Sequence, residues 1–237
     1  MKNISFAITA STEHLELNKL LYDLREVFTE NDNEIVIQVD SDTVTEKVKY
    51  TINHFIQLVP LFHGRIKYVS YPLRKDGKAD FAAFKNNLTN HCKGDYIFQI
   101  DADERIHPTL LVGLRNVIES TNADLIVIPR YNTVNGITPE YIEAWGWNVL
   151  QVGSDKVINY PDAQGRIYKR SPDIKWFGNV HERILGHKTE VNLADMMVGL
   201  LANSKEKLDV LNVQRFCLIH EKDLDKQVEQ NKFYASL

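Results

Sequence analysis

The sequence predicts an α/β fold built on a mostly parallel central sheet with helices on both faces. Apolar runs of strand length alternate with segments of helical periodicity through the first 132 residues, which is typical of parallel sheets whose two faces are covered. Three of these runs end in polar residues, at Thr9, Asp40 and Asp101. Because ligands bind beyond the carboxyl ends of such strands, we expect the functional site at that edge of the sheet.

Each element before residue 133 has its own local signal. Leu17, Leu20, Leu21 and Leu24 recur at helical spacing, as one face of an amphipathic helix requires, and Pro108 suits the start of a helix. The expected strands are 4–9, 34–42, 65–72, 94–101 and 123–132, and the expected helices are 14–28, 45–58, 80–91 and 108–119. A polar, glycine-containing loop is expected at 73–80.

The pattern changes in the last third of the chain. Residues 133–155 show no clear period but contain Trp145 and Trp147. The stretch 166–185 predicts two short strands around a turn at 171–173. A helix at 196–207, a short strand at 214–220 and a charged helical tail from Asp223 are also expected. The absence of repeats and of an obvious linker indicates a single domain that spans residues 1–237 and includes a smaller C-terminal region.

The composition excludes several classes of protein. Hydrophobic residues make up 43% and charged residues 25% of the chain, which is typical of ordinary globular proteins. The net charge of −4 predicts no general attraction to nucleic acid or to anionic membranes. No stretch approaches the roughly 18 apolar residues that cross a bilayer, and the N-terminus lacks the apolar core of a signal peptide. With only two cysteines, the chain is expected to be cytoplasmic.

The segment YIFQIDADERIHP, residues 96–108, ends an apolar strand with the acids Asp101, Asp103 and Glu104. In extended conformation the first two point to the same side, and paired carboxylates suit Mg²⁺ or Mn²⁺. A polar turn with capping aspartates is the alternative, because Asp is common where strands end. Glu104 is either a supporting partner of such a site or a solvated residue.

Several segments together resemble the nucleotide-sugar glycosyltransferases of the Rossmann-like GT-A fold, in particular the large inverting family 2. The resemblance covers most of residues 3–185 and extends to the tail LIHEKDLDKQVEQNKFYASL. It is carried by ISFAITAST, EIVIQVDSD, KADFAAFKNNLTNHCKGDYIFQIDADERI and YPDAQGRIYKRSPDIKWFGNVHERI. It implies a hexosyltransferase in which residues 1–132 bind the nucleotide sugar and residues 133–237 form the acceptor-side and closing part.

The resemblance also implies contacts to the donor. Thr9, Ala10 and Asp40 are expected at the nucleobase and ribose, although Asp40 could simply form a strand-end turn. Lys78 is expected at phosphate and Asp80 at sugar or ribose hydroxyls, with Lys75 as a further possibility. Asp101 and Ala102 are expected at the nucleotide. Arg166 and Arg170 either hold phosphate or are paired or solvated.

The same resemblance implies a cation site and a base. Asp103 is the expected ligand of Mn²⁺ or Mg²⁺, with Asp101 at the ribose or at the metal through water, and His220 or His181 completing the site. An inverting transfer needs a base for the acceptor hydroxyl, and Glu182 fits by type. His181 and Glu182 would point to opposite faces of a strand.

Neighbouring residues leave alternatives open. Trp176 and Phe177 are either an apolar wall against a sugar or core aromatics, and the core is favoured for Phe177. Relatives often carry Arg-Asn where this chain has Lys85-Asn86. This departure leaves the role of Lys85 open, and solvation is favoured.

The function expected from all this is metal-dependent transfer of a sugar, with a UDP sugar as donor, to a hydroxyl with inversion. The acceptor is a glycan, a lipid-linked sugar, a protein or a modified nucleic-acid base. A nucleotidyltransferase is the alternative enzyme, but ITASTEHLE lacks the glycine and arginine of its usual phosphate loop. A non-catalytic nucleotide-sugar or glycan-binding module is the third possibility.

Overall fold

The structure is a computed structural model that describes residues 2–29, 32, 34–58, 60–62, 64–195 and 213–235. The helix expected at 196–207 lies outside the described residues. The main sheet has seven strands in the order β15-β8-β12-β6-β1-β2-β3. The strands of this sheet are β1 Ile4–Ala10, β2 Glu34–Asp40, β3 Ile66–Tyr71, β6 Tyr96–Asp101, β8 Leu125–Ile128, β12 Gln164–Lys169 and β15 Glu190–Asn192. All neighbouring pairs are parallel except those of β12, which runs antiparallel to β6 and β8.

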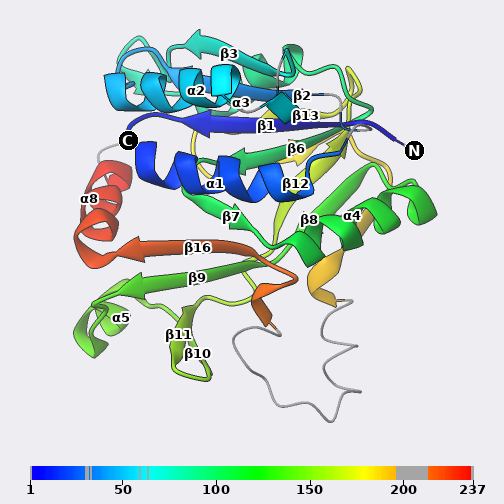
Figure 1. Ribbon diagram of the computed structural model, residues 1–237. Helices are drawn as coiled ribbons and strands as arrows, with labels where there is room; N and C mark the ends of the chain where they lie inside the picture. The colour runs from blue at the N-terminus through cyan, green and yellow to red at the C-terminus, as the bar shows by residue number, and fades with distance from the viewer. Residues whose placement is uncertain are drawn as a thin grey trace.

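Helices cover both faces of this sheet (Figure 1). On one face α1 (His14–Val27) packs against α2 (Glu46–Leu58) and α4 (Pro108–Thr121). On the other, α3 (Phe81–Asn90) packs against the hairpin strand β13 (Lys175–Phe177), which pairs with β14 (Arg183–Leu185). Alternate residues of β1 enter the two cores: Phe6 and Ile8 one, Ala7 the other. Because both faces are covered, the strands are continuous buried runs rather than alternating ones.

A second sheet lies beside the first and has the order β10-β11-β9-β16-β7 (Figure 1). Its strands are β7 Glu104–Ile106, β9 Arg130–Asn135, β10 Val149–Val152, β11 Asp155–Ile158 and β16 Leu218–Asp223. Consecutive strands pass directly from the main sheet into this one between β6 and β7 and between β8 and β9. Helix α5 (Pro139–Trp145) follows β9, and helix α8 (Leu224–Ala235) follows β16.

Most elements of the first 132 residues are confirmed, and so is the helical tail, but the regions joining the sheets differ from the prediction. The single strand expected at 123–132 is two strands in different sheets, separated by Pro129, which has no N–H for a sheet ladder. The loop at 73–80 contains a small hairpin, β4 (Arg74–Lys75) and β5 (Lys78–Ala79). Its turn at Asp76 and Gly77 has positive φ at both residues, as tight hairpin turns require.

The C-terminal third holds the other corrections. The irregular segment 133–155 contains the end of β9, α5 and β10, which pairs with β11 just after it. The stretch 166–185 forms three strands rather than two, because β12 joins the main sheet and β13 pairs with β14. The strand expected at 214–220 begins only at Leu218 and continues to Asp223. A 3₁₀ turn at Pro60–Phe62 completes the elements named here.

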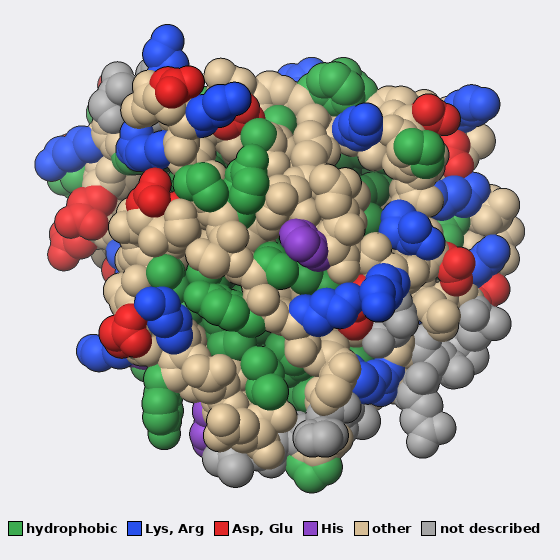
Figure 2. Space-filling view, turned by 90° about the horizontal axis from the view of Figure 1, so that it is seen from above, with side chains coloured by type: hydrophobic (Ala, Val, Ile, Leu, Met, Phe, Trp, Pro, Cys, Tyr) green, Lys and Arg blue, Asp and Glu red, His purple; other side chains and the backbone are tan. Residues whose placement is uncertain are grey.

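The surface shows no dominant charge on the face in Figure 2, where Lys and Arg side chains are interspersed with Asp and Glu around the rim. Within the described ranges, none of the helices has both the length and the apolar composition needed to span a bilayer.

Candidate active site

A cavity of about 1000 Å³ opens at the carboxyl ends of β1, β2 and β6, and residues of both sheets line it. Most of the predicted site residues lie on its wall: Thr9, Ala10, Asp40, Asp101, Ala102, Asp103, His181, Glu182 and His220. Lys78 and Asp80 do not line it, although Leu73 and Phe81 near them do. The structure therefore gathers most of the predicted residues around one space.

Asp101 ends β6, and protein donors surround its carboxylate. Thr9 Oγ1 donates to Asp101 Oδ1 over 2.7 Å, and Arg166 Nη2 donates to Oδ2 over 3.0 Å. Lys85 Nζ lies 3.6 Å from Oδ1. Burial alone would raise the pKa of Asp101, but the charges of Lys85 and Arg166, with the hydrogen bonds from Thr9 and Arg166, outweigh it and lower the pKa far below its usual range. Asp101 is therefore an ionised group whose oxygens are already engaged.

Glu104 lies fully buried behind Asp101, at the start of β7. Its Oε1 accepts a hydrogen bond from Arg166 Nη2 over 2.5 Å, and its Oε2 accepts one from the Asp101 backbone N–H over 3.0 Å. Arg130 Nη1 lies 3.5 Å from the same Oε1, and Arg130 also pairs with Asp162. Glu104 is therefore a buried partner of basic residues from both sheets rather than a solvated one.

Asp103 faces different neighbours. The chain turns at Ala102 and Asp103, so the extended geometry expected for the two aspartates does not apply. His220 Nε2 lies 3.3 Å from Asp103 Oδ2, and Lys222 Nζ lies 3.5 Å from the same oxygen. Burial alone would raise the pKa of Asp103, but His220 and Lys222 outweigh it and lower the pKa well below its usual range. The imidazole is oriented by Asn132, whose Oδ1 lies 2.9 Å from His220 Nδ1.

These residues fit a divalent cation in part. An ionised carboxylate and a histidine nitrogen lie side by side on the cavity wall, and these are acceptable ligands for Mn²⁺. Within the part of the chain that the structure describes, no group of three or more His, Cys, Asp or Glu side chains is arranged to hold a metal. Asp101 is occupied by Thr9 and Arg166. The donor set therefore suits a cation that takes its remaining ligands from a diphosphate and water.

Glu182 lines the cavity from the segment that leads into β14. Its Oε1 is 2.7 Å from Lys85 Nζ, and the same ammonium group lies 4.6 Å from the centre of the Trp176 ring. Lys85 is 6% exposed, so the solvated lysine favoured from the sequence is wrong. Lys85 links the predicted base to Asp101, and a buried lysine requires such carboxylate partners.

The β13–β14 hairpin, whose connecting segment carries His181 and Glu182, is fastened to α3 at β13. Asn86 Nδ2 donates to the Trp176 carbonyl oxygen over 2.8 Å, and the Trp176 backbone N–H donates to Asn86 Oδ1 over 2.9 Å. Trp176 is buried and lines the cavity, whereas Phe177 is 50% exposed. The core position favoured for Phe177 is therefore wrong, because alternation along β13 turns Trp176 inward and Phe177 outward.

The predicted donor contacts at β2 and α3 have local hydrogen-bonding roles. Asp40 accepts hydrogen bonds from the backbone N–H groups of Asp42 and Leu73 and from the Thr43 hydroxyl. Its carboxylate thus joins the end of β2 to the loop after β3. Asp80 caps α3, because its Oδ1 accepts from the Ala83 N–H over 2.8 Å. Lys78 is exposed on β5.

Sequence reasoning missed some residues that the structure places at the site. Lys85, Asp162, Asn132 and Lys222 all line the cavity; of these, the sequence singles out Lys85 alone, with its role left open. One signal for Lys85 was available. Ala82, Lys85 and Leu88 are spaced by three residues and share the buried face of α3, so helical periodicity places Lys85 toward the interior. Arg166, considered for phosphate, is buried and paired instead, while Arg170 is exposed.

Comparison with known proteins supports one family. The family model described as glycosyl transferase family 2 matches residues 5–186. No curated protein matches the sequence significantly. A crystal structure of S. aureus TarS 1–349 superimposes with a TM-score of 0.55 at 13% sequence identity, covering 81% of this chain and 58% of that one. The same fragment in complex with UDP-GlcNAc gives a TM-score of 0.55 at 14% identity, over 81% of this chain and 56% of that one. The chain thus spans under two thirds of the length of this neighbour.

Proposed function

Because this chain belongs to glycosyl transferase family 2 and is a glycosyltransferase with a GT-A fold, we propose that it transfers a sugar from a UDP sugar to an acceptor hydroxyl, with inversion and with the help of a divalent cation. The observation that carries the proposal is the shared cavity. It brings the ionised Asp103, with His220 beside it, and Glu182 to the same space. The UDP-GlcNAc bound by the similar TarS fragment supports a UDP sugar as the donor class.

The donor is proposed to lie along the carboxyl ends of β1, β2 and β6. Thr9, Ala10 and Ala102 offer it a wall of small groups, and Asp40 fixes the loop that closes this wall at Leu73. Lys78 and Asp80 remain predicted contacts of the donor. Lys78 lies on the β4–β5 hairpin and Asp80 at the start of α3, near the cavity residues Leu73 and Phe81.

Asp103 and His220 are proposed to hold Mn²⁺ or Mg²⁺, which stabilises the departing diphosphate when it is bound. Asp101 is proposed to contact the nucleotide rather than to ligate the metal directly, since Arg166 and Thr9 engage both of its oxygens. Lys222, 3.5 Å from Asp103 Oδ2, adds a fixed positive charge at the same place. A cationic site of this kind favours a leaving group that gains negative charge.

Glu182 is proposed to take the proton of the acceptor hydroxyl while that oxygen attacks the anomeric carbon and the bond to the diphosphate breaks. The proton ends on the Glu182 carboxylate, and the electron pair leaves with the diphosphate. Lys85 holds one oxygen of Glu182 at 2.7 Å and so fixes the carboxylate in the cavity. Fixed geometry between base and nucleophile supplies much of the rate in such reactions. His181, on the same loop and exposed at the cavity, is proposed to assist in binding the diphosphate.

Thermal unfolding with nucleotide sugars tests the proposal. A UDP sugar at 100 times its dissociation constant stabilises the folded protein by about 2.7 kcal/mol, and we expect the shift to be larger when Mn²⁺ is present. Asp103→Asn should remove the Mn²⁺-dependent part of the shift. Asp42→Asn is the matched control, because Asp42 is an exposed aspartate just beyond β2 and should leave the shift unchanged.

The same assay separates the alternatives. Stabilisation by a UDP sugar together with Mn²⁺-dependent release of UDP supports the transferase. A shift with nucleoside triphosphates alone would favour a nucleotidyltransferase. Binding without any turnover would favour a non-catalytic module, and no shift with any nucleotide would overturn the donor site.

A further inference from the structure

An aromatic cluster extends from the cavity onto the second sheet. Tyr141 and Trp145 of α5 have ring centres 4.9 Å apart, and Trp145 and Trp147 have ring centres 4.6 Å apart. All three side chains are partly exposed. We call Tyr141, Trp145 and Trp147 the aromatic shelf. Helix α5 itself has no buried residue, so packing of a core does not account for its aromatic residues. Exposed apolar clusters of this kind mark binding surfaces.

The shelf is continuous with the active-site cavity. Trp147 lines the cavity together with Val134 of β9 and Ile158 of β11, whereas Trp145 and Tyr141 lie beyond it. A ligand whose end lies in the cavity therefore meets Trp147 first and the other rings after it. Figure 1 shows α5 at the outer end of β9, next to the β10–β11 hairpin.

The backbone fixes the position of the rings. Gly146 adopts a left-handed conformation with φ of 63° directly after α5, which ends the helix between the two tryptophans. The Trp147 N–H donates to the Ile142 carbonyl oxygen over 3.0 Å. The next residue is held by Asn159, whose Oδ1 accepts from the Asn148 N–H over 2.9 Å. A backbone fixed in this way limits the conformational entropy that is lost when a ligand binds to the rings.

The charges near the shelf select among possible ligands. Glu140 and Glu143 are exposed on α5, and this helix contains no lysine or arginine. Helices that bind membrane surfaces are rich in Lys and Arg, and nucleic-acid sites are basic, so neither ligand suits this helix. A neutral sugar ring fits it, because its apolar C–H face packs on an aromatic ring while its hydroxyls reach carboxylates and water.

We propose that the aromatic shelf binds successive sugar rings of an oligosaccharide acceptor whose terminal hydroxyl lies near Glu182. The inference deepens the proposed transferase function and rests on it for the reaction, but the binding of the glycan can be measured separately. It predicts that affinity rises with the length of the glycan. It also assigns the acceptor to glycans, rather than to proteins, lipids or nucleic-acid bases.

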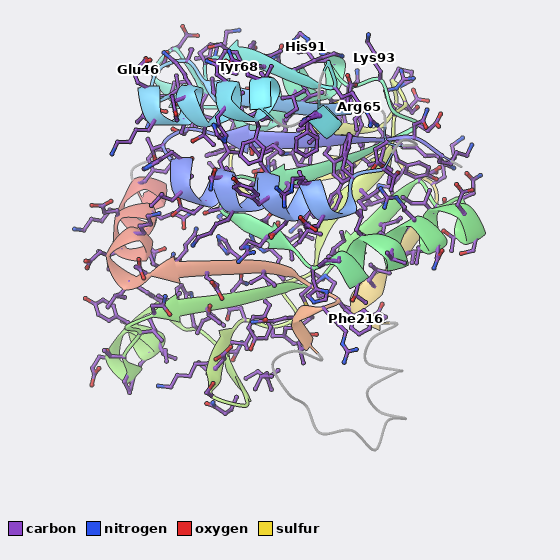
Figure 3. The ribbon with its side chains drawn as sticks, viewed as in Figure 1. Glu46, Arg65, Tyr68, His91, Lys93 and Phe216 are labelled. Carbon is purple, nitrogen blue, oxygen red and sulfur yellow. The ribbon has the colours of Figure 1, made fainter. Side chains whose placement is uncertain are left out.

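A glycan array of α- and β-linked oligosaccharides of one to six sugars, probed with the labelled full chain, tests the inference. We expect binding that strengthens with length beyond the monosaccharide. Trp145→Ala should weaken that binding about 10-fold, the upper range for one aromatic contact. Tyr68→Ala is the matched control. Tyr68 is 41% exposed, close to the 37% of Tyr141, and lies on the β3 side of the main sheet, far from α5 (Figure 3).

The thermal midpoint of each variant is measured first, and Tyr141→Ala serves as a second, milder variant should Trp145→Ala fold poorly. The proposal for the aromatic shelf would be overturned if no glycan bound, if affinity did not depend on glycan length, or if both Trp145→Ala and Tyr141→Ala bound glycans as tightly as the wild type. Binding to phosphatidylglycerol vesicles that is lost in Trp145→Ala would also overturn it, in favour of a membrane surface. Length-dependent glycan binding without any turnover of UDP sugars would leave the shelf standing and refute the transferase proposal.

Discussion

Two groups of charged side chains meet at the junction of the sheets, and they differ in what satisfies them. In the inner group, Glu104 is 0% and Arg166 1% exposed, and each is the other's partner. In the outer group, Asp103 pairs with His220 and Lys222, and Glu182 pairs with Lys85. Both carboxylates also line the cavity. Both groups pair carboxylates with basic side chains. Burial on all sides makes the inner group structural, while access from the cavity leaves the outer group available to ligands.

Glu182→Gln is the largest expected effect and tests the outer group. The amide keeps the shape of the side chain but cannot accept the proton, so we expect transfer to fall by about 10²–10⁴-fold while the midpoint of thermal unfolding and the affinity for UDP stay nearly constant. Steady-state transfer and UDP titration measure the two quantities. Transfer within a few-fold of wild type would place the base elsewhere on the cavity wall.

Arg166→Met tests the inner group and should affect the fold. It leaves the Glu104 carboxylate buried without its main partner, and breaking a buried pair in this way costs about 3–5 kcal/mol. Denaturant unfolding measures the loss. Arg25→Met is the control, since Arg25 forms an exposed pair with Glu26, and such pairs contribute about 0–1 kcal/mol.

A double variant separates the pair from the packing around it. Nε and Nη1 of Arg166 are buried and have no hydrogen-bond partner among the described residues, so the arginine is imperfectly satisfied. Replacing Arg166 and Glu104 together by Met should therefore recover part of the stability, because the Glu104 carboxylate is no longer buried without its main partner. Asp101 keeps Thr9 and Lys85, and Arg130 keeps Asp162. Equal stability of Arg166→Met and wild type would remove the distinction between the two groups.

The acidic motif shows how far the sequence alone reaches. The apolar run from Tyr96 to Ile100 predicts a buried strand, and Asp101 marks its end correctly. The sequence does not indicate which residue pairs with each acid. Arg166 meets Glu104 from 62 residues away, and His220 meets Asp103 from 117 residues away. Local patterns therefore predict the place of the carboxylates, whereas tertiary packing decides which of them is buried.

The same limit applies to the prediction of the two sheets. The strands of the main sheet that follow each other as β1, β2 and β3 are buried continuous runs separated by helices, and these were predicted. The second sheet combines β7, β9 and β16 from distant parts of the chain, and its β10 is largely exposed. The sequence predicts parts of β9 and β16, but short strands with distant partners lack a strong local period, so their bounds and their common sheet follow only from the pairing in the folded chain.

Lys85 links Glu182 of the outer group to Asp101, which pairs with Arg166 of the inner group, and its replacement is expected to have a smaller effect on transfer than Glu182→Gln. Its ammonium group is 2.7 Å from Glu182 and 3.6 Å from Asp101. Lys85→Met keeps the apolar stem and removes the charge, so Glu182 loses the contact that orients it. A misplaced catalytic group costs about 10²-fold in rate, and we expect that loss in kcat with little change in the KM for the donor.

Lys85→Arg is the matched variant, because it retains the positive charge in a different shape. Partial recovery of kcat by Lys85→Arg, with the thermal midpoints of both variants close together, would identify a positioning role in the outer group. Should Lys85→Met instead unfold at much lower denaturant while the surviving protein transfers sugar normally, Lys85 would belong to the inner group. That result would make the contact of Lys85 with Glu182 a structural one.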